Sequence, residues 1–475
     1  MGYLPESQSP AGASPTSAIL ASMDLVVRST RVLIGDRLAP ASLHLRGGRI
    51  ASIAAFDELL PGVPLLDEGE HVILPGAVDA HVHVNEPGRT EWEGFETATR
   101  AAAAGGITTV VDMPLNCIPV TTTVAAVAEK ARATAGRCFV DHAFWGGVIP
   151  GNEAELDAMV EAGITGFKCF LVHSGIDEFP NVVEADLRRA MPRLAARGAV
   201  LLVHAEVPGP IDRAEAAGRG LDPRRYATFL ASRPRAAEDE AIAMIVRLVR
   251  ETGCRAHIVH LSSSDALETL AAARKEGLPI TAETCPHYLT FAAEEIEDGD
   301  TLFKCCPPIR ERENRERLWQ EGLASGVIGQ IVSDHSPCTP ALKRPEEGDF
   351  MAAWGGIAGL ELGFLATYTE ATARGFDVPT ISRWVSSTPA ALAGVAHRKG
   401  RIAEGLDADL VVFDPEATTV VDAATLHHRH AITPWAGRKL RGRILRTMLR
   451  GETLHEAGRF GAAPAGIRVD ARTAR

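Results

Sequence analysis

The sequence predicts an α/β protein made of a (β/α)8 TIM barrel and a small β-sandwich domain built from both chain ends. In the middle of the chain, strand-like apolar runs alternate with helix-like segments, which is typical of a parallel sheet with crossover helices. Short β-type runs dominate both ends instead. With 46% hydrophobic and 23% charged residues among 475, the chain is globular and long enough to bury a large core. A doubly wound open sheet is the alternative architecture.

The two ends of the chain are each expected to combine β structure with a disordered segment. Residues 1–22 are rich in Ser, Pro, Ala and Gly and lack the basic and apolar segments of a secretory signal, so we expect a disordered leader. Residues 23–74 and 400–460 each hold several short strands, too few to bury a core alone, and together they are expected to form the β-sandwich domain. Residues 461–475 are expected to be a flexible C-terminal tail.

Residues 75–399 are expected to form the barrel. Helical periodicity fills the intervals between the strand-like runs, for example at residues 237–251 and 264–276. The eight runs that we assign to barrel strands are residues 77–83, 107–114, 139–146, 163–170, 199–206, 256–262, 280–287 and 329–336. Because the carboxyl ends of barrel strands meet at one mouth, where active sites lie, polar side chains at these ends should converge.

Polar residues stand at or near the ends of several of these apolar runs. They are His81, His83, Lys168, His204, His260 and Asp334. His81 and His83 are two residues apart on a strand and therefore share a face, which suits metal chelation. A single histidine of this kind could be an ordinary core residue, but its recurrence at several strand ends favours a site for divalent metal ions.

Lys168 is the least expected residue of this set. It lies between Phe167 and Cys169 in an apolar strand, where burial of an unpaired ammonium costs several kcal/mol or forces deprotonation. An ammonium would also repel neighbouring metal ions. Lys168 must therefore act as a neutral amine or be converted into an anion. Carbamylation by CO₂ would give it a carboxylate-like group with two oxygens, able to bridge two metals.

Charge and composition exclude several other classes of protein. The net charge is −12, so the chain offers no electrostatic footprint for nucleic acid or for an anionic membrane surface. No uncharged apolar run reaches the roughly 18 residues of a membrane span. The eight cysteines are scattered, without a CxxC pair, which indicates reduced thiols in a cytoplasmic protein.

Longer motifs surround the six polar residues. They occupy residues 78–95 (VDAHVHVNEPGRTEWEGF), 112–123 (DMPLNCIPVTTT), 166–171 (GFKCFL), 304–310 (KCCPPIR) and 333–338 (SDHSPC). With these motifs the chain, from residue 23 to about residue 450, resembles the cyclic amidohydrolases of the amidohydrolase superfamily, and among them the allantoinases. The resemblance implies a barrel with a small β-sandwich, and a homotetramer.

The resemblance also implies a binuclear metal centre. The ligands would be divided between two ions that share Lys168 as N6-carboxylysine, with His81, His83 and Asp334 on one ion and His204 and His260 on the other. Zinc is expected, while Fe²⁺, Co²⁺ and Mn²⁺ suit the same donors. A hydroxide bridging the ions would attack the ring carbonyl, and Asp334 would act first as the base and then as the acid that protonates the leaving nitrogen.

Two positions separate this chain from related branches of the family. Dihydroorotases carry Arg two residues after the second histidine, where this chain has Asn85, although Arg89 follows four residues later. Hydantoinases and dihydropyrimidinases carry Tyr five residues after the bridging lysine, where this chain has His173. The resemblance therefore implies allantoin as the small-molecule substrate, opened to allantoate in purine degradation. A hydantoinase, dihydropyrimidinase or dihydroorotase-like activity is the alternative.

Substrate contacts are expected from Asn116, Cys305 and Gly356. Asn116 follows the second strand and could equally be a turn residue, Cys305 follows the seventh strand, and Gly356 would let a loop after the eighth strand approach the ligand closely. Arg89 and Arg310 are better explained as solvated or ion-paired residues. A non-catalytic scaffold is the remaining alternative; it would show gaps among the six ligand positions, and the sequence shows none.

Overall fold

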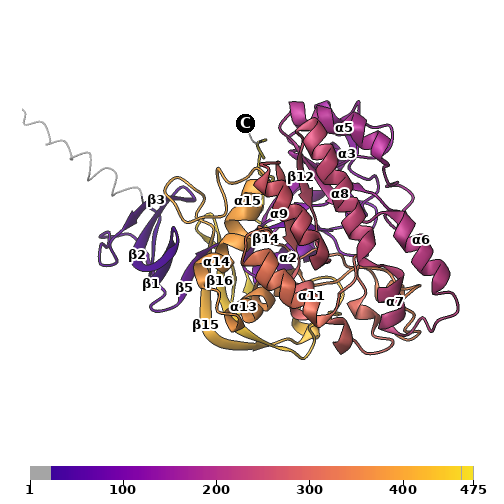
Figure 1. The fold of residues 1–475 in the computed structure, drawn as a ribbon. Helices are drawn as coiled ribbons and strands as arrows, with labels where there is room; N and C mark the ends of the chain where they lie inside the picture. Colours follow the sequence, from indigo (N-terminus) through magenta and orange to yellow (C-terminus); the bar gives the residue numbers. More distant parts are fainter. Residues whose placement is uncertain (1–22, 462, 474–475) are drawn as a thin grey trace, which may run out of the picture.

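The computed structural model describes residues 23–461 and 463–473, so the leader expected at residues 1–22 lies outside the described residues. A nine-stranded sheet contains strands from both chain ends, and two parallel sheets lie in the middle of the chain (Figure 1). Helices α2 to α15 lie around and between the parallel strands. Within this described part of the chain, no helix is long and apolar enough to cross a membrane.

The nine-stranded sheet joins the two β-rich ends of the chain. Its strands are β1 (Leu25–Ile34), β2 (Arg37–Arg46), β3 (Arg49–Ala54), β4 (Leu65–Asp67), β5 (Val72–Pro75), β15 (Leu410–Val420), β16 (Lys439–Leu449), β17 (Glu452–Glu456) and β18 (Arg459–Phe460). The order is β18-β17-β16-β15-β5-β1-β2-β3, with β4 beside β1. Strand β5 is the junction, because it pairs with β1 on one side and with β15 on the other. Val27, Ile73, Leu410 and Met448 share one buried cluster across it.

The parallel strands follow the eight apolar runs of the sequence. They are β6 (Ala77–Val82), β7 (Ile107–Asp112), β8 (Asp141–Phe144), β9 (Gly146–Gly147), β10 (Gly166–Phe170), β11 (Val200–His204), β12 (Arg255–Ile258), β13 (Ile280–Thr284) and β14 (Gln330–Ile331). Each run contains a strand, which confirms the eight strand predictions. One sheet has the order β6-β7-β8 and the other β14-β13-β12-β11-β10-β9. An isolated parallel bridge pairs Val82, at the end of β6, with His335 beyond β14.

Helices lie between most successive parallel strands, and α12 to α15 follow the last of these strands, β14. They are α2 (Phe95–Ala104), α3 (Val124–Thr134), α4 (Leu156–Glu161), α5 (Glu184–Ala196), α6 (Pro208–Ala217), α7 (Tyr226–Ser232), α8 (Arg235–Thr252), α9 (Leu267–Lys275), α10 (Pro286–Thr290), α11 (Arg312–Arg317), α12 (Pro340–Lys343), α13 (Gly363–Ala373), α14 (Val378–Ser382) and α15 (Thr388–Leu392). The helix predicted at residues 237–251 is α8. It buries Ala241, Ile245 and Leu248 along one face, as the helical period requires, and ends at Gly253, whose φ of 65° suits a C-terminal cap.

Residues 463–473 contact the rest of the protein, whereas we expected a flexible tail over residues 461–475. Gly466 donates to the carbonyl of Cys138 (2.8 Å), and Val469 donates to the carbonyl of His142 (2.8 Å). Val469 is buried. A Cβ at Gly466 would lie only 1.9 Å from the carbonyl oxygen of Val140, so the close approach requires glycine. The tail is held because this extended segment pairs with backbone groups beside β8.

Candidate active site

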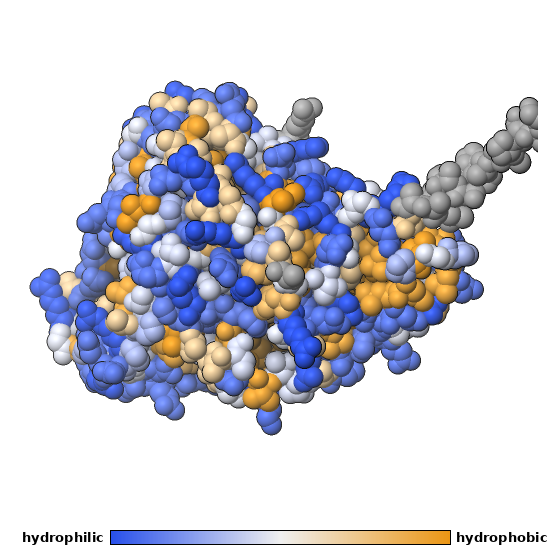
Figure 2. Space-filling view, turned by 180° about the vertical axis from the view of Figure 1, so that it is seen from behind, coloured by the Kyte–Doolittle hydropathy of each residue, from blue (hydrophilic) through white to orange (hydrophobic). Residues whose placement is uncertain are grey.

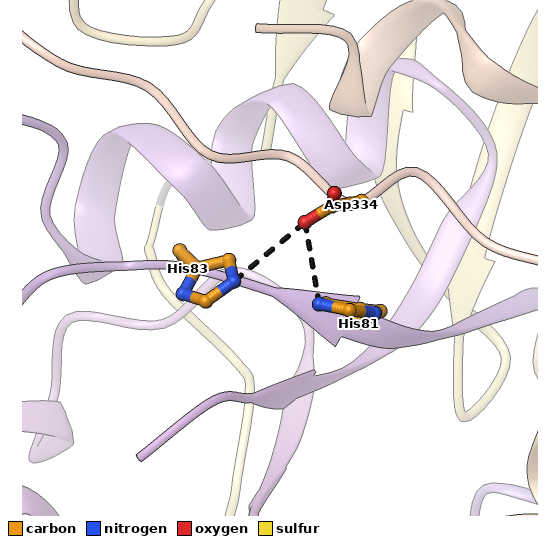
Figure 3. Close-up of side chains that lie close together, drawn as sticks. All are labelled: His81, His83 and Asp334. Atoms are coloured by element: carbon orange, nitrogen blue, oxygen red, sulfur yellow. Dashed lines mark ion pairs between the residues drawn. The ribbon is translucent and has the colours of Figure 1, made fainter. Parts of the chain in front are cut away.

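His81, His83 and Asp334 meet at the carboxyl ends of β6 and β14 (Figure 3). Oδ1 of Asp334 lies 3.2 Å from Nε2 of His81 and 3.6 Å from Nε2 of His83. All three side chains are buried. Burial lowers the pKa of both histidines, so their rings are neutral and each carries a nitrogen lone pair. Two imidazoles and a carboxylate at these separations form a donor set for a divalent cation.

His204 and His260 form a second pair of donors. His204 ends β11, and His260 lies two residues beyond β12. Nδ1 of His204 and Nε2 of His260 are 3.0 Å apart, and the ring centroids of His260 and His81 are 5.4 Å apart. The two groups of histidines therefore face one centre. His260 and Asp334 have positive φ angles of 39° and 43°, a strained conformation that is frequent at functional sites.

Lys168 lies in β10, and its side chain is fully buried. Its Nζ atom has no hydrogen-bond partner among the described residues. Burial lowers the pKa of Lys168, which favours the neutral amine, and Asp334 opposes this shift. Burial also raises the pKa of Asp334. A buried lysine without an ion-pair partner next to imidazoles is costly in stability, and this indicates a chemical role.

Three groups that the sequence analysis did not identify orient the histidines. Oε1 of Glu283 lies 2.6 Å from Nδ1 of His81, Oε2 of Glu206 lies 2.7 Å from Nε2 of His204, and the carbonyl of Leu115 lies 3.1 Å from Nδ1 of His83. Each contact engages one ring nitrogen and leaves the other for the centre, an arrangement found in metal sites.

Glu283 and Glu206 remain charged although they are fully buried. Burial would raise the pKa of Glu283, but His257 and His81 hold it well below its usual range. Burial would likewise raise the pKa of Glu206, but Arg233 and His204 bring it to about 2. The sequence did carry a signal for Glu283, because this charged residue lies inside the seventh predicted strand run, residues 280–287. Glu206 is the last residue of the fifth predicted strand run, residues 199–206, and the sequence analysis assigned it no role.

The donor atoms lack partners that a bound cation would supply. His81 Nε2 and Lys168 Nζ are buried without a hydrogen bond in residues 23–461 and 463–473. Leaving such atoms unsatisfied costs about 1–3 kcal/mol each. The donors are imidazoles, a carboxylate and a lysine that could be carbamylated. These residues therefore fit a pair of divalent metal ions better than they fit an apolar or hydrogen-bonded core.

A cavity of about 260 Å³ opens onto this centre. Its lining includes the donors His83, Lys168, His204, His260 and Asp334. It also includes the three predicted substrate contacts, Asn116, Cys305 and Gly356. His173, which occupies the position of the hydantoinase tyrosine, also lines the cavity. The structure thus brings every predicted site residue except His81 to the cavity wall, and His81 lies directly behind it against Asp334.

Arg89, Arg310 and Asn85 do not line the cavity. Arg89 donates to the carbonyl of Asn116 (2.7 Å) and forms an ion pair with Glu178 (3.0 Å). Arg310 is buried against Glu238 at 2.6 Å. Asn85 accepts hydrogen bonds from the backbone and side-chain amides of Asn116 (3.2 and 3.1 Å). These three residues support the wall of the site from behind.

Comparison with known proteins gives consistent results. The model of the amidohydrolase family matches residues 72–454. An allantoinase of Streptomyces avermitilis is 49% identical over 442 residues, covering 93% of this chain and 97% of the relative. An allantoinase of Saccharomyces cerevisiae is 45% identical over 386 residues, covering 81% and 82%. The solved L-hydantoinase (dihydropyrimidinase) of Arthrobacter aurescens superimposes with a TM-score of 0.90 at 32% identity, covering 94% of this chain and 99% of that one.

Proposed function

The chain belongs to the amidohydrolase family, and we propose that it hydrolyses the cyclic amide of allantoin, opening the ring to allantoate. The observation that carries this proposal is the convergence of four histidines, Lys168 and Asp334 on one cavity of about 260 Å³. Relatives from a bacterium and a yeast that match most of the chain are named allantoinases. The complete set of donors argues against a non-catalytic scaffold.

The centre is proposed to hold two divalent metal ions. His81, His83 and Asp334 would hold one, His204 and His260 the other, and Lys168, carbamylated by CO₂, would contact both. The unpartnered buried atoms of His81 and Lys168, and the 3.0 Å separation of Nδ1 of His204 from Nε2 of His260, support this assignment. Zinc suits imidazole and carboxylate donors, and Fe²⁺, Co²⁺ or Mn²⁺ would fit the same set.

The chain's own residues position the reacting groups. When bound, the metal ions supply a polarised ring carbonyl and a water of lowered pKa. Asp334 lines the cavity beside the metal-binding histidines, where its carboxylate can accept the proton of the attacking water. It then returns this proton to the ring nitrogen as the C–N bond breaks. Glu283 and Glu206 hold the rings of His81 and His204 in place throughout.

We propose that the parallel strands close into an eight-stranded barrel spanning residues 75–399. Two observations support closure. The chain passes directly from β8 in one parallel sheet to β9 in the other, with one residue between them, and Val82 bridges to His335 at the other edge. Residues 23–74 and 400–460 are proposed to form the β-sandwich domain. The cluster shared by Val27, Ile73, Leu410 and Met448 supports this pairing of the chain ends.

We also propose a homotetramer that works in the cytoplasm. All eight cysteines are free thiols, as expected in a reducing compartment. Apolar residues gather over the β1–β5 region in the view of Figure 2, and the exposed apolar side chains of this part include Leu59 and Leu65. Such a patch favours association between copies. Light scattering of the purified protein would show the mass of a tetramer.

Hydantoin ring opening is the second candidate activity, because a solved hydantoinase matches the fold closely. The position of its tyrosine is occupied here by His173, which is largely exposed and lies 3.5 Å from Asp177. We therefore expect hydantoin to be a poorer substrate than allantoin.

A panel of cyclic amides tests the proposal. The protein is purified from metal-supplemented cells, and ring opening of racemic allantoin, hydantoin, dihydrouracil and dihydroorotate is followed in parallel. Allantoin should be hydrolysed fastest, and Asp334→Asn should abolish the reaction. Preference for hydantoin or dihydrouracil would contradict the substrate while leaving the metal chemistry intact. No ring opening by a metal-loaded enzyme would contradict both.

A further inference from the structure

A thiol and an imidazole lie close to the carboxylate that we propose as the base. Cys285 directly follows β13, His287 lies in the first turn of α10, and Asp334 lies beyond the neighbouring strand β14. One donor atom from each of Cys285, His287 and Asp334 lies within 4.8 Å of the others. Cys285 and His287 play no part in the proposed ring opening, and neither lines the cavity.

His287 is fully buried, and neither of its ring nitrogens has a hydrogen-bond partner within residues 23–461 and 463–473. Buried imidazoles in proteins are normally satisfied, because a lost partner costs about 1–3 kcal/mol. Cys285 is also fully buried. His142, His428 and His455 are also buried without hydrogen bonds among the described residues, but His287 differs from them because it lies within reach of both a thiol and a carboxylate. The unpaired ring beside a thiol and a carboxylate therefore indicates a ligand.

The donor types indicate which ligand. A thiolate, an imidazole and a carboxylate together select a thiophilic divalent cation such as Zn²⁺ or Cd²⁺, and not Mg²⁺ or Ca²⁺. On binding, the S–H bond of Cys285 breaks, the proton passes to solvent, and the sulfur forms the bond to the cation. No change of oxidation state is involved. The ion can enter through the cavity, because Asp334 lines it.

We propose that Cys285, His287 and Asp334 form an inhibitory site for a thiophilic divalent cation. An ion held there engages the carboxylate that the ring opening needs for proton transfer, so occupancy stops turnover. This consequence rests on the proposed role of Asp334. Binding of the cation does not rest on that role, because it depends only on the three donor side chains.

Cadmium binding to the zinc-loaded enzyme tests the proposal. The six ligands assigned to the catalytic centre include no cysteine, so thiolate-to-cadmium charge-transfer absorption reports only on thiol sites. Wild-type enzyme should develop this absorption on titration with Cd²⁺, with a parallel loss of ring-opening activity. Cys285→Ala should lose the absorption and resist inhibition. His287→Gln should bind Cd²⁺ roughly tenfold more weakly or worse, because a ligand is lost.

Cys254→Ala is the matched control, because Cys254 is an equally buried thiol at the opposite end of β12 from His260. It should behave like wild type in both readouts, and circular dichroism should show that all variants are folded. Unchanged absorption and inhibition in both Cys285→Ala and His287→Gln would overturn the proposal, as would the absence of the absorption in wild type. If the protein opened no ring, the absorption of wild type and Cys285→Ala would still decide whether the site exists.

Discussion

Two fully buried lysines of this chain have opposite surroundings. Lys399 contacts three carboxylates, with Nζ lying 2.5 Å from Asp141, 2.8 Å from Asp407 and 2.7 Å from Asp409. Burial alone would lower its pKa, but these carboxylates raise it. Lys168 has no such partner, and burial lowers its pKa. Lys399 is therefore a charged structural residue, whereas Lys168 is a candidate for reaction with CO₂.

The carboxylates around the two lysines show the same contrast. Asp141, Asp407 and Asp409 have the spacing of a metal site, but Lys399 supplies the positive charge among them and Arg450 adds an ion pair to Asp141 at 2.6 Å. At the active site, Asp334 faces neutral imidazoles. Donor spacing alone therefore does not identify a metal site. A metal site is indicated where the donors are buried together and no lysine or arginine side chain forms an ion pair with them.

Replacing Lys168 should have the largest effect on activity. Lys168→Met should reduce allantoin hydrolysis by roughly 10³-fold or more, because the bridging ligand of the metal pair is lost. When both proteins are compared free of metal ions, the melting temperature of the variant should be equal or higher, because an unpaired buried amine is replaced by an apolar side chain. Calorimetry and kinetics on the same preparation measure both. A folded variant with near-wild-type activity would place the reactive group elsewhere.

Asp334→Asn should have the second largest effect on activity. It keeps the size of the side chain but removes the proton acceptor, so kcat should fall by about 10²–10⁴-fold. Metal analysis of the variant separates this loss from simple metal release. If kcat stayed within a few-fold of wild type while the metals remained bound, Asp334 would not be the base.

Lys399→Met should show the reverse pattern. Removing the cation leaves the buried Asp409 without an ion pair, and leaves Asp141 and Asp407 with only Arg450 and Arg398, which should lower the free energy of unfolding by about 3–5 kcal/mol. The kcat of the folded variant should be unchanged. Unaltered thermal stability would show that the cluster is not structural.

The pH dependence sharpens this comparison. Because the pKa of Lys399 is raised in the folded chain, its stabilisation is fully present below the unfolded value of about 10.4 and is lost as pH rises through the folded value. The difference in melting temperature between wild type and Lys399→Met should therefore be constant at neutral pH and shrink above about pH 10.4. A difference that disappeared on acidification alone would contradict the ion-pair account.

The smallest effect is expected at an orienting residue. Glu206→Gln keeps the shape beside His204 but removes the charge that holds the ring, and metal affinity should fall by about 10–100-fold. Competition with a chelator measures this affinity. An unchanged affinity would mean that Arg233 and packing suffice to orient His204.

Much of this site was predictable from local sequence. Apolar runs that end in His81, Lys168 or Asp334 are visible without a structure. An apolar run predicts a buried strand, and a polar residue only a few positions away in the same run stands out against that prediction. The orienting groups were not predictable in this way. Glu283 and His81 lie 202 residues apart, and their contact exists only once the strands are assembled. The same holds for Val469, whose burial depends on the backbone hydrogen bonds of this C-terminal segment beside β8.

Carbon-13 NMR of protein prepared with labelled bicarbonate tests the contrast between the two lysines most directly. We predict a carbamate resonance in wild type and in Lys399→Met, and none in Lys168→Met. Absence of the resonance from metal-loaded wild type, or its persistence in Lys168→Met, would contradict the assignment of Lys168 as the reactive lysine.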